Sequence, residues 1–304
     1  MAKADVKQEV FNPDNVMLSR TKDGELIKKY QDIILKKTVE QSIIPSIATM
    51  KPMDKQEVTF SAFLGGIGSF WVGEGKKIQT SKPEWKQLTM KAHKIAVILL
   101  ASKEYLDFTD SEFFSRMTPE VAKAFAQKID QAIIANEDNP FAWSLKEAYA
   151  DGDKVIKGDI TAENIHKIQG IVEDNDFDVS DFISTRKNRS ALRAANEVIG
   201  NETIRLFDQD GKKLDGSYLH ETKVIPQGTL IALDRENLFY GVPRNMEMDI
   251  TTTGQISTVK NEDGSSVNLF EQGLIAARYT MDFGFMMTTN DGVAAIEKGA
   301  DAPK

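Results

Sequence analysis

Two stretches near the start of the chain have strand-like patterns: apolar and polar residues alternate over 58–63, and residues 95–100 form a continuous apolar run. Between them, Phe70 and Trp71 form an aromatic pair that is followed by glycines and lysines. This pattern predicts a long two-stranded tongue over residues 51–102, with a polar tip. An isolated two-stranded hairpin is at best marginally stable in water. We therefore expect the tongue to lie on a second molecule.

The strongest helical period in the chain follows the tongue. Apolar residues recur at steps of three and four between residues 111 and 136, which places them on one stripe of a helix. Thr109 and Glu112 have the spacing of a capping box at its start. Pro119 lies inside the pattern, so we expect either a kink or a new helix that begins with Thr118 as its N-cap. At ~1.5 Å per residue the element would be about 40 Å long, which suggests a spine helix.

The polar N-terminal segment, residues 1–25, predicts an extended arm, with a disordered tail as the alternative. A helical pattern over residues 24–49 is expected to end at Pro45. Shorter helices and strands alternate between residues 152 and 234, which predicts a compact α/β layer. Its expected elements are a helix capped by Thr161, a strand at 179–184, a helix at 188–198, a strand at 204–207 and two strands within 223–233.

From residue 238 onward the pattern predicts strands. Asp263-Gly264 is a strong signal for the tip of a second hairpin, and Lys260 and Asn261 precede it with Glu262 between. Residues 293–304 read as a polar tail. Two projecting hairpins and a loose arm leave strand edges that proteins normally pair or blunt, which again predicts contacts with other molecules.

Composition and charge narrow the class of protein. The chain has 304 residues, 41% of them hydrophobic, and a net charge of 38 − 46 = −8. This charge disfavours a nucleic-acid binder that works by bulk electrostatics. The chain has no cysteine, so no disulfide or thiol nucleophile is available. The N-terminus lacks the apolar segment of a signal peptide, and no run reaches the ~18–20 apolar residues of a membrane span, so we expect a soluble protein without a membrane partner.

We find no pattern that predicts catalysis, a cofactor or a metal. The three histidines, His93, His166 and His220, are far apart and lack the spacing of metal ligands. An acidic run at residues 174–178 resembles the start of a calcium loop, but valine and threonine occupy the positions that need glycine and glutamate. No G-x-S-x-G motif is present. We therefore predict that the protein is not an enzyme; a soluble enzyme with an unrecognised site is the alternative of another class.

Four segments carry a resemblance to a known family. They are FNPDNVM at 11–17, WVGEG at 71–75, NPF at 139–141, and STVKNEDG with NLFEQ within 257–272. Their order and spacing resemble tailed-bacteriophage major capsid proteins of the Hong Kong 97-like fold, in the branch found in siphophages of Gram-positive bacteria. The resemblance runs from about residue 9 to about residue 290 and implies an α+β fold with an N-terminal arm, an E-loop, a peripheral domain and an axial domain.

The resemblance also implies a division of the chain. Residues 1–50 would form the arm and a short helix, and residues 51–102 the E-loop tongue. The peripheral domain would comprise 103–144, with the spine helix, and 238–292, with the strands and hairpin. Residues 145–237 would form the axial domain and 293–304 the tail.

The implied function is assembly. Copies would form hexamers and pentamers of an icosahedral shell around double-stranded DNA, held without sequence specificity. The other implied partners are a portal protein and, because the family pattern starts at Phe11, a separate scaffolding protein. The protein would belong to the virion capsid and assemble in the bacterial cytoplasm. An encapsulin-type bacterial compartment is the alternative with the same fold.

The tongue supplies the candidate contact residues. Trp71, Ile78 and Trp85 would lie against a neighbour's spine helix, and Glu74, Lys76 and Lys77 would form charge pairs at the rim, each worth ~0–1 kcal/mol. The remaining candidates are two glycine hinges, a bend in the spine helix and the second hairpin: Gly73, Gly75, Pro119, Lys260, Asn261, Asp263 and Gly264.

Overall fold

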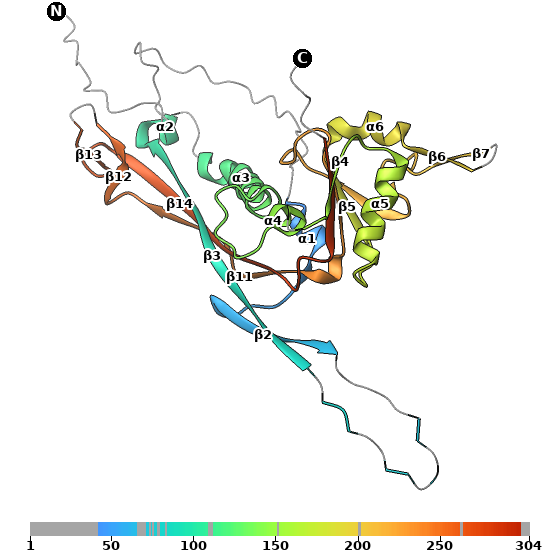
Figure 1. The fold of residues 1–304 in the computed structure, drawn as a ribbon. Coiled ribbons are helices and arrows are strands. Elements are labelled where there is room, and N and C mark those ends of the chain that lie inside the picture. The colour runs from blue at the N-terminus through green and yellow to red at the C-terminus, as the bar shows by residue number, and fades with distance from the viewer. Residues whose placement is uncertain are drawn as a thin grey trace, which may run out of the picture. The chain divides into compact units, whose positions relative to one another are not determined.

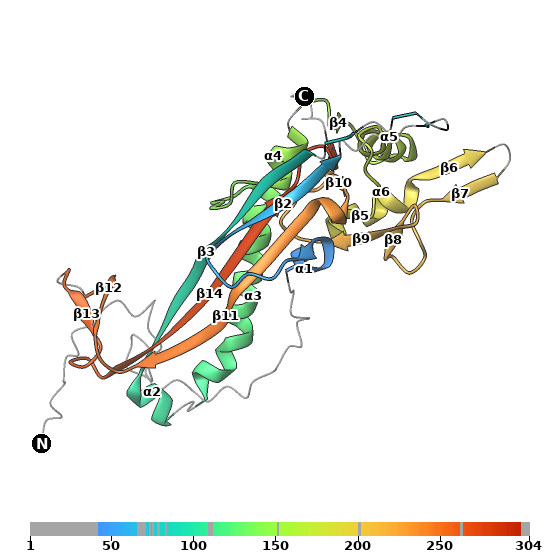
Figure 2. The same ribbon diagram turned by 90° about the horizontal axis from the view of Figure 1, so that it is seen from below.

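The protein is described here from a computed structural model. The described residues are 42–65, 71–72, 74, 76–77, 80–82, 84–108, 112–150, 152–199, 202–261 and 264–298. The fold is α+β, as predicted, with one five-stranded and one six-stranded sheet (Figures 1 and 2). The chain divides into two compact units. The first comprises Met1–Gln41, Lys94–Phe125 and Arg244–Asp282, and the second Ser42–His93, Ala126–Pro243 and Phe283–Lys304.

The five-stranded sheet has the strand order β1-β11-β14-β3-β2. Its strands are β1 (Thr49–Met50), β2 (Glu57–Gly65), β3 (Glu84–Ser102), β11 (Leu238–Thr251) and β14 (Leu274–Met287). β3, β11 and β14 contribute residues to both units. The tongue is therefore not a separate hairpin, because β3 continues from it into the sheet.

In the first unit one face of the sheet is covered along β3, and the opposite face only near the end of β3, since Ile98 is 44% exposed. Side chains alternate between faces along a strand, so Val97, Leu99 and Ala101 of β3 lie on one face with Ala277 and Tyr279 of β14. They pack against α2 (Lys103–Phe108) and the first half of α3 (Phe113–Ala135) through Tyr105, Phe113, Phe114, Val121 and Phe125. On the opposite face, Leu100, Leu274 and Ala276 pack against the hairpin of β12 (Gln255–Lys260) and β13 (Ser266–Asn268).

The predicted spine helix is α3. The prediction that a new helix begins at Thr118 is wrong. α3 runs through Pro119 without a new start. The Thr118 hydroxyl instead donates back to the carbonyl of Phe114 at 3.1 Å, and the buried Tyr279 hydroxyl donates to the same carbonyl at 2.7 Å. Both hydrogen bonds go to the turn before Pro119; the carbonyl that loses its backbone donor to the proline is that of Ser115, four residues earlier. At ~1.5 Å per residue, α3 is about 34 Å long. Thr109 lies outside the described residues.

The six-stranded sheet of the second unit has the order β4-β15-β10-β5-β9-β8. Its strands are β4 (Val155–Lys157), β5 (Asp181–Ser184), β8 (Lys213–Leu214), β9 (Ser217–Glu221), β10 (Leu230–Leu233) and β15 (Val293–Glu297). The prediction of a polar tail from residue 293 is wrong, since β15 pairs with β10 and β4 inside this sheet. Its first four residues are all apolar and buried. Five residues before a polar end were too few to show a period.

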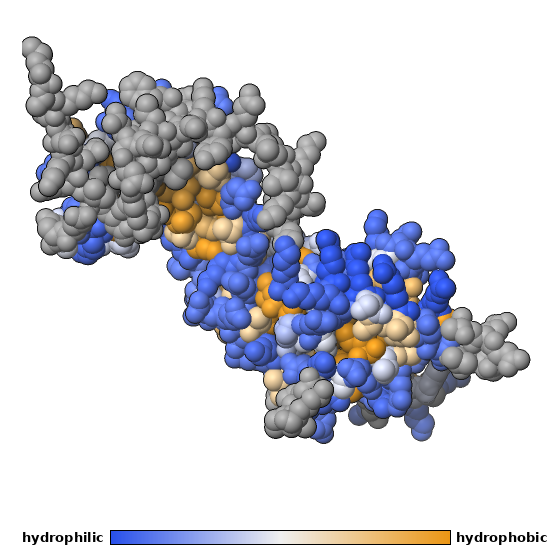
Figure 3. Space-filling view, turned by 90° about the horizontal axis from the view of Figure 1, so that it is seen from above, coloured by the Kyte–Doolittle hydropathy of each residue, from blue (hydrophilic) through white to orange (hydrophobic). Residues whose placement is uncertain are grey.

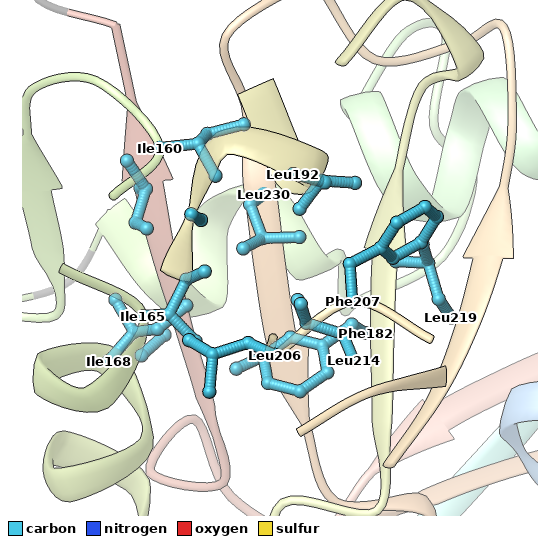
Figure 4. Packing of buried hydrophobic residues seen from close by; sticks show 14 of the residues in the cluster. Ile160, Ile165, Ile168, Phe182, Leu192, Leu206, Phe207, Leu214, Leu219 and Leu230 are labelled. Atoms are coloured by element: carbon cyan, nitrogen blue, oxygen red, sulfur yellow. The ribbon is translucent and has the colours of Figure 1, made fainter. Parts of the chain in front are cut away.

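The core of the second unit lies between this sheet and α5 (Ala162–Glu173). Ile165, Ile168 and Val172 on one face of α5 pack against Phe182 and Leu230 of the sheet (Figure 4). The predicted cap is confirmed, because the Thr161 side chain accepts a hydrogen bond from the Asn164 N–H at 3.3 Å. A capping oxygen satisfies one of the otherwise unpaired N–H groups of the first turn.

Other predicted boundaries needed correction. The helix expected at 188–198 ends early, as α6 (Arg189–Ala194), and is followed by a hairpin of β6 (Asn196–Ile199) and β7 (Glu202–Arg205). Most of the helix expected over 24–49 lies outside the described residues; Pro45 itself lies in the first turn of α1 (Ile44–Ile47), a position where its missing N–H costs nothing. Only β10 forms within 223–233. The remaining short elements are α4 (Leu145–Ala150) and the 3-10 turns η2 (Arg186–Asn188) and η3 (Arg235–Asn237).

Among the described residues, no helix is long and apolar enough to cross a membrane.

Candidate interaction surface

The base of the tongue is packed within its own chain. Met53, Leu88, Met90, Ala92 and Met286 form a buried cluster there, with further contacts from Val58, Phe60, Trp143 and Phe239. Gly241 makes this packing possible, since a Cβ at that position would lie 2.5 Å from the Met53 sulfur. The base of the tongue is therefore buried by its own chain. This corrects the expectation that the whole tongue lies on a second molecule.

Farther from the base, the tongue is held mainly by its strand ladder. β2 and β3 pair in antiparallel register from Glu57 opposite Lys91 to Gly65 opposite Glu84, with a shift after Phe63. The exposed ion pair of Glu57 and Lys91, at 3.4 Å, lies at the base end of this ladder and contributes little stability. On β3, apolar burial stops at Leu88, whereas the strand continues outward through the exposed residues 85–87.

The predicted contact residues of the tongue are exposed where the structure describes them. The side chain of Trp85, on β3, is 61% exposed and Trp71 is fully exposed at 105%. Glu74, Lys76 and Lys77 are exposed as well. Ile78 and the two predicted hinges, Gly73 and Gly75, lie outside the described residues. Tryptophan is enriched among residues that anchor protein interfaces, so the tongue carries a candidate interaction surface among the described residues.

The predicted second hairpin is formed by β12 and β13, and its turn bonds to itself. The Asn261 amide donates to the Ser265 hydroxyl at 2.8 Å, and Lys260 Nζ donates to the Ser266 hydroxyl at 3.3 Å. Gly264 has a φ of 81°, which glycine adopts without strain. Asp263 lies outside the described residues. Val259 and Val267 are buried on the sheet, so this hairpin does not project freely as predicted.

Phe270 follows the second hairpin and was not singled out from the sequence. It is 77% exposed on a turn that Asn268 and Gln272 hold through two hydrogen bonds, from the Phe270 N–H to Asn268 Oδ1 at 3.2 Å and from the Asn268 N–H to Gln272 Oε1 at 3.1 Å. The sequence does contain a signal for this residue, because Phe270 is a single aromatic residue among polar residues that favour turns.

Asp130 is a second residue that sequence reasoning missed. It is buried on α3, and its carboxylate accepts hydrogen bonds from the Ser42 hydroxyl at 2.6 Å and the Ile43 N–H at 3.3 Å. Burial raises the pKa of Asp130 to about 6, although the bonds from Ser42, Ile43 and Ile44 oppose the rise. An aspartate inside a helical period gives no sign of its distant partner at Ser42.

Asp181 is the most buried charged group of the six-stranded sheet. Its carboxylate accepts from Arg235 Nη2 at 2.8 Å and the Ser180 hydroxyl at 2.8 Å, and lies 2.8 Å from His220 Nε2. Burial alone would raise the pKa of Asp181, but the bonds from His220, Ser180 and Arg235 and the charge of Arg235 hold it below its ordinary value. This network is structural, since Asp181 has no exposed surface.

The chemistry of the described residues is otherwise sparse. They contain no group of three or more acidic, histidine or cysteine side chains that could hold a metal ion. Of the histidines, His220 belongs to the Asp181 network, His93 packs edge-on against Phe141 with ring centroids 5.5 Å apart, and His166 is half-buried on α5.

Comparison with known proteins agrees with the fold. The sequence pattern of the phage capsid family matches residues 26–298. The chain is 43% identical over 299 residues to the major capsid protein of Staphylococcus phage 80alpha, covering 97% of this chain and 91% of that protein. It is 22% identical over 276 residues to a probable major capsid protein of Mycobacterium phage L5, covering 84% of this chain and 83% of that protein.

Solved structures show the same fold at lower identity. A chain from Microbacterium phage Oxtober96 aligns with a TM-score of 0.73 at 20% identity, covering 90% of this chain and 96% of that chain. A capsid chain of an empty GTA particle aligns with a TM-score of 0.65 at 13% identity, covering 91% of this chain and 94% of that chain. The family match over most of the sequence and the relative at 43% identity show that this chain belongs to the phage capsid family, with the Hong Kong 97-like fold.

Proposed function

We propose that this chain, a major capsid protein of a tailed phage, builds the shell of the virion by laying the outer part of its tongue on a neighbouring copy. It is a structural protein and not an enzyme. The observation that carries the proposal is the exposure of Trp71 and Trp85 beyond the point where the chain's own core covers the tongue.

The energetics suit a closed lattice. Burying one tryptophan against a neighbour removes 150–250 Å² from water, or roughly 4–6 kcal/mol at about 25 cal/mol per Å² before the cost of association is subtracted. Glu74, Lys76 and Lys77 would add rim pairs of ~0–1 kcal/mol each. A single contact of this size is weak, but a closed shell repeats it in every subunit.

We also propose how the domains contact one another in the shell and which partners the shell has. Hexamers and pentamers would meet through an axial domain, which we extend from 145–237 to include β15 because β15 lies inside the six-stranded sheet. The peripheral domain, 103–144 and 238–292, would contact other capsomers. We propose double-stranded DNA, a portal protein and a separate scaffolding protein as further partners. The net charge of −8 suits a container that attracts phosphates only weakly.

The test is to compare the full chain with a chain whose tongue is truncated from residue 73 to residue 85. We expect the full chain to form shells or rings in negative-stain electron microscopy and the truncated chain to stay unassembled, with the same urea midpoint for the remaining fold. Normal shells from the truncated chain would refute the role of the tongue while leaving the family membership intact.

A further inference from the structure

The second unit contains a hollow that the shell-building surface does not use. Its volume is about 760 Å³, within the range of ligand pockets. It lies between the end of α3, α4, the turn after β5 and residues 223–227. Small hydrophobic areas bordered by hydrophilic residues are visible in the space-filling view of the molecule (Figure 3).

The floor and the rim of this hollow differ in chemistry. Apolar side chains of Ile134, Val224 and Ile225 line it together with the ring of Tyr149. Its cationic residues are Lys146, Arg186, Lys187 and Lys223, against two carboxylates, Glu137 and Glu297. One of these carboxylates is engaged, since Glu297 accepts a hydrogen bond from the Tyr149 hydroxyl at 3.1 Å. The lining is thus locally positive in a chain whose net charge is −8.

The cations are placed to meet an outside partner. Arg186 is 80% exposed, although its Nε lies 3.3 Å from Glu221. Glu221 is already paired through both oxygens with Arg189. Lys146 and Lys187 are exposed. Cations at the rim of an apolar pocket favour an anionic occupant and steer its approach.

A second hollow continues the first. It has a volume of about 360 Å³, shares Lys187 and Gln227 with the larger hollow, and is lined by Lys298 and Asp159 as well. Two adjoining hollows suit an extended chain better than one compact molecule. We call the pair the cationic groove.

The wall of the cationic groove is preformed. The segment 223–227 is pinned at one end by the bond from the Thr222 N–H to the Ser184 carbonyl at 2.9 Å. At the other end, the Gly228 N–H donates to Asn188 Oδ1 at 2.8 Å. Gly228 has a φ of 89°, and a Cβ there would lie 2.6 Å from Lys298 Cβ. A fixed wall lowers the ordering cost of binding.

We propose that the cationic groove docks an acidic peptide segment of another protein, with an apolar residue of that segment on the floor and its carboxylates at Lys146, Arg186 and Lys187. Nucleic acid fits less well, because phosphates need cations or polar donors and would leave the apolar floor without a contact. The inference goes beyond shell building and does not depend on it.

The test begins with a random twelve-residue peptide library selected on the purified full chain. The enriched peptides are then synthesised with a fluorescent label and titrated by anisotropy. We expect them to combine aspartate or glutamate with a large apolar residue. The double variant Lys146→Glu with Lys187→Glu should bind these peptides about tenfold more weakly or worse. Losing rim pairs worth roughly 1.4 kcal/mol in total changes affinity tenfold.

Matched controls separate the groove from net charge and from folding. Lys55→Glu with Lys103→Glu makes the same change in net charge at exposed lysines outside the groove and should leave affinity within about twofold. Val224→Ser should weaken the apolar peptides several-fold but not polyglutamate. Urea midpoints check that each variant folds.

Three results would overturn the proposal. The first is that no peptide is enriched, and the second is that the enriched peptides bind both charge variants equally. The third is that a 20-base-pair DNA binds more tightly than the peptides and is lost with Lys146→Glu and Lys187→Glu. That outcome would assign the groove to nucleic acid instead.

Discussion

Strand β10 and the outer part of strand β3 both carry large apolar side chains, but they differ in what covers them. All four residues of β10, Leu230–Leu233, are buried, and Leu230 and Ala232 belong to the core that includes Ile165, Ile168 and Val172 of α5. β3 starts with Trp85 exposed and becomes covered only at Leu88 and Met90. The same class of residue is buried within the chain in one region and exposed in the other, where we propose that a neighbouring copy covers it.

This difference separates folding from assembly. Substitutions in the six-stranded sheet should lower the free energy of unfolding and reduce assembly only because less folded protein remains. Substitutions at the tip of the tongue should leave the free energy of unfolding unchanged and reduce assembly directly. The predictions below test this separation, from the largest expected effect on stability to the smallest.

Phe182→Ala should have the largest effect. Phe182 is fully buried in the core of the second unit, and truncating a buried phenylalanine typically costs about 3–5 kcal/mol. Urea unfolding followed by circular dichroism measures the loss. A cost below about 1 kcal/mol would mean that this core does not hold the second unit together.

Asp181→Asn should cost about 3 kcal/mol, because it leaves the buried side of Arg235 without its charge partner. The matched control is Asp249→Asn, which breaks an exposed pair with Arg278 and should cost less than about 0.5 kcal/mol. The pKa of Asp181 is lowered on folding, so its contribution is present above its unfolded pKa and is lost as pH falls through the folded pKa. Equal losses for both variants would contradict the structural role of the network.

Asp130→Asn should reveal a dependence on pH of opposite sign. The pKa of Asp130 rises from 3.8 to about 6 on folding, so the native state binds the extra proton between these values and loses stability as pH rises through them. The stability of the unmodified chain relative to the variant should therefore fall by about 2–3 kcal/mol from pH 4 to pH 7, at ~1.4 kcal/mol per pKa unit. Urea midpoints at each pH measure this difference. A difference that is flat with pH would show that Asp130 has an ordinary pKa.

The elements predicted correctly are those whose signals lie within their own stretch of sequence. Thr161 and the three apolar residues of α5 gave its start and its buried face, and Asp263-Gly264 gave the position of the second hairpin. The long apolar stripe of α3 was also clear. The family resemblance supplied the fold as a whole, which no single element could have done.

Long-range partners explain what was missed. Nothing near Val293 shows that β10 and β4 receive it as a central strand. Pro119 predicted either a kink or a new start at Thr118, and α3 makes no new start there; the sequence around Pro119 gives no sign that Tyr279 contacts the preceding turn. Asp130 and Asp181 were not singled out from the sequence, since their partners Ser42 and Arg235 come from distant segments. The exposed tongue residues could be predicted because the sequence near them offers few apolar side chains to bury them.

The most direct test of the separation between folding and assembly is the double variant Trp71→Ser with Trp85→Ser, with Trp71→Phe and Trp85→Phe together as the control. Both side chains are exposed, so the urea midpoint of the serine variant should stay within the equivalent of about 0.5 kcal/mol of the unmodified chain. Sedimentation velocity should show the unmodified and phenylalanine chains as shells or capsomers and the serine variant as unassembled protein. Shells from the serine variant in normal yield would contradict the account.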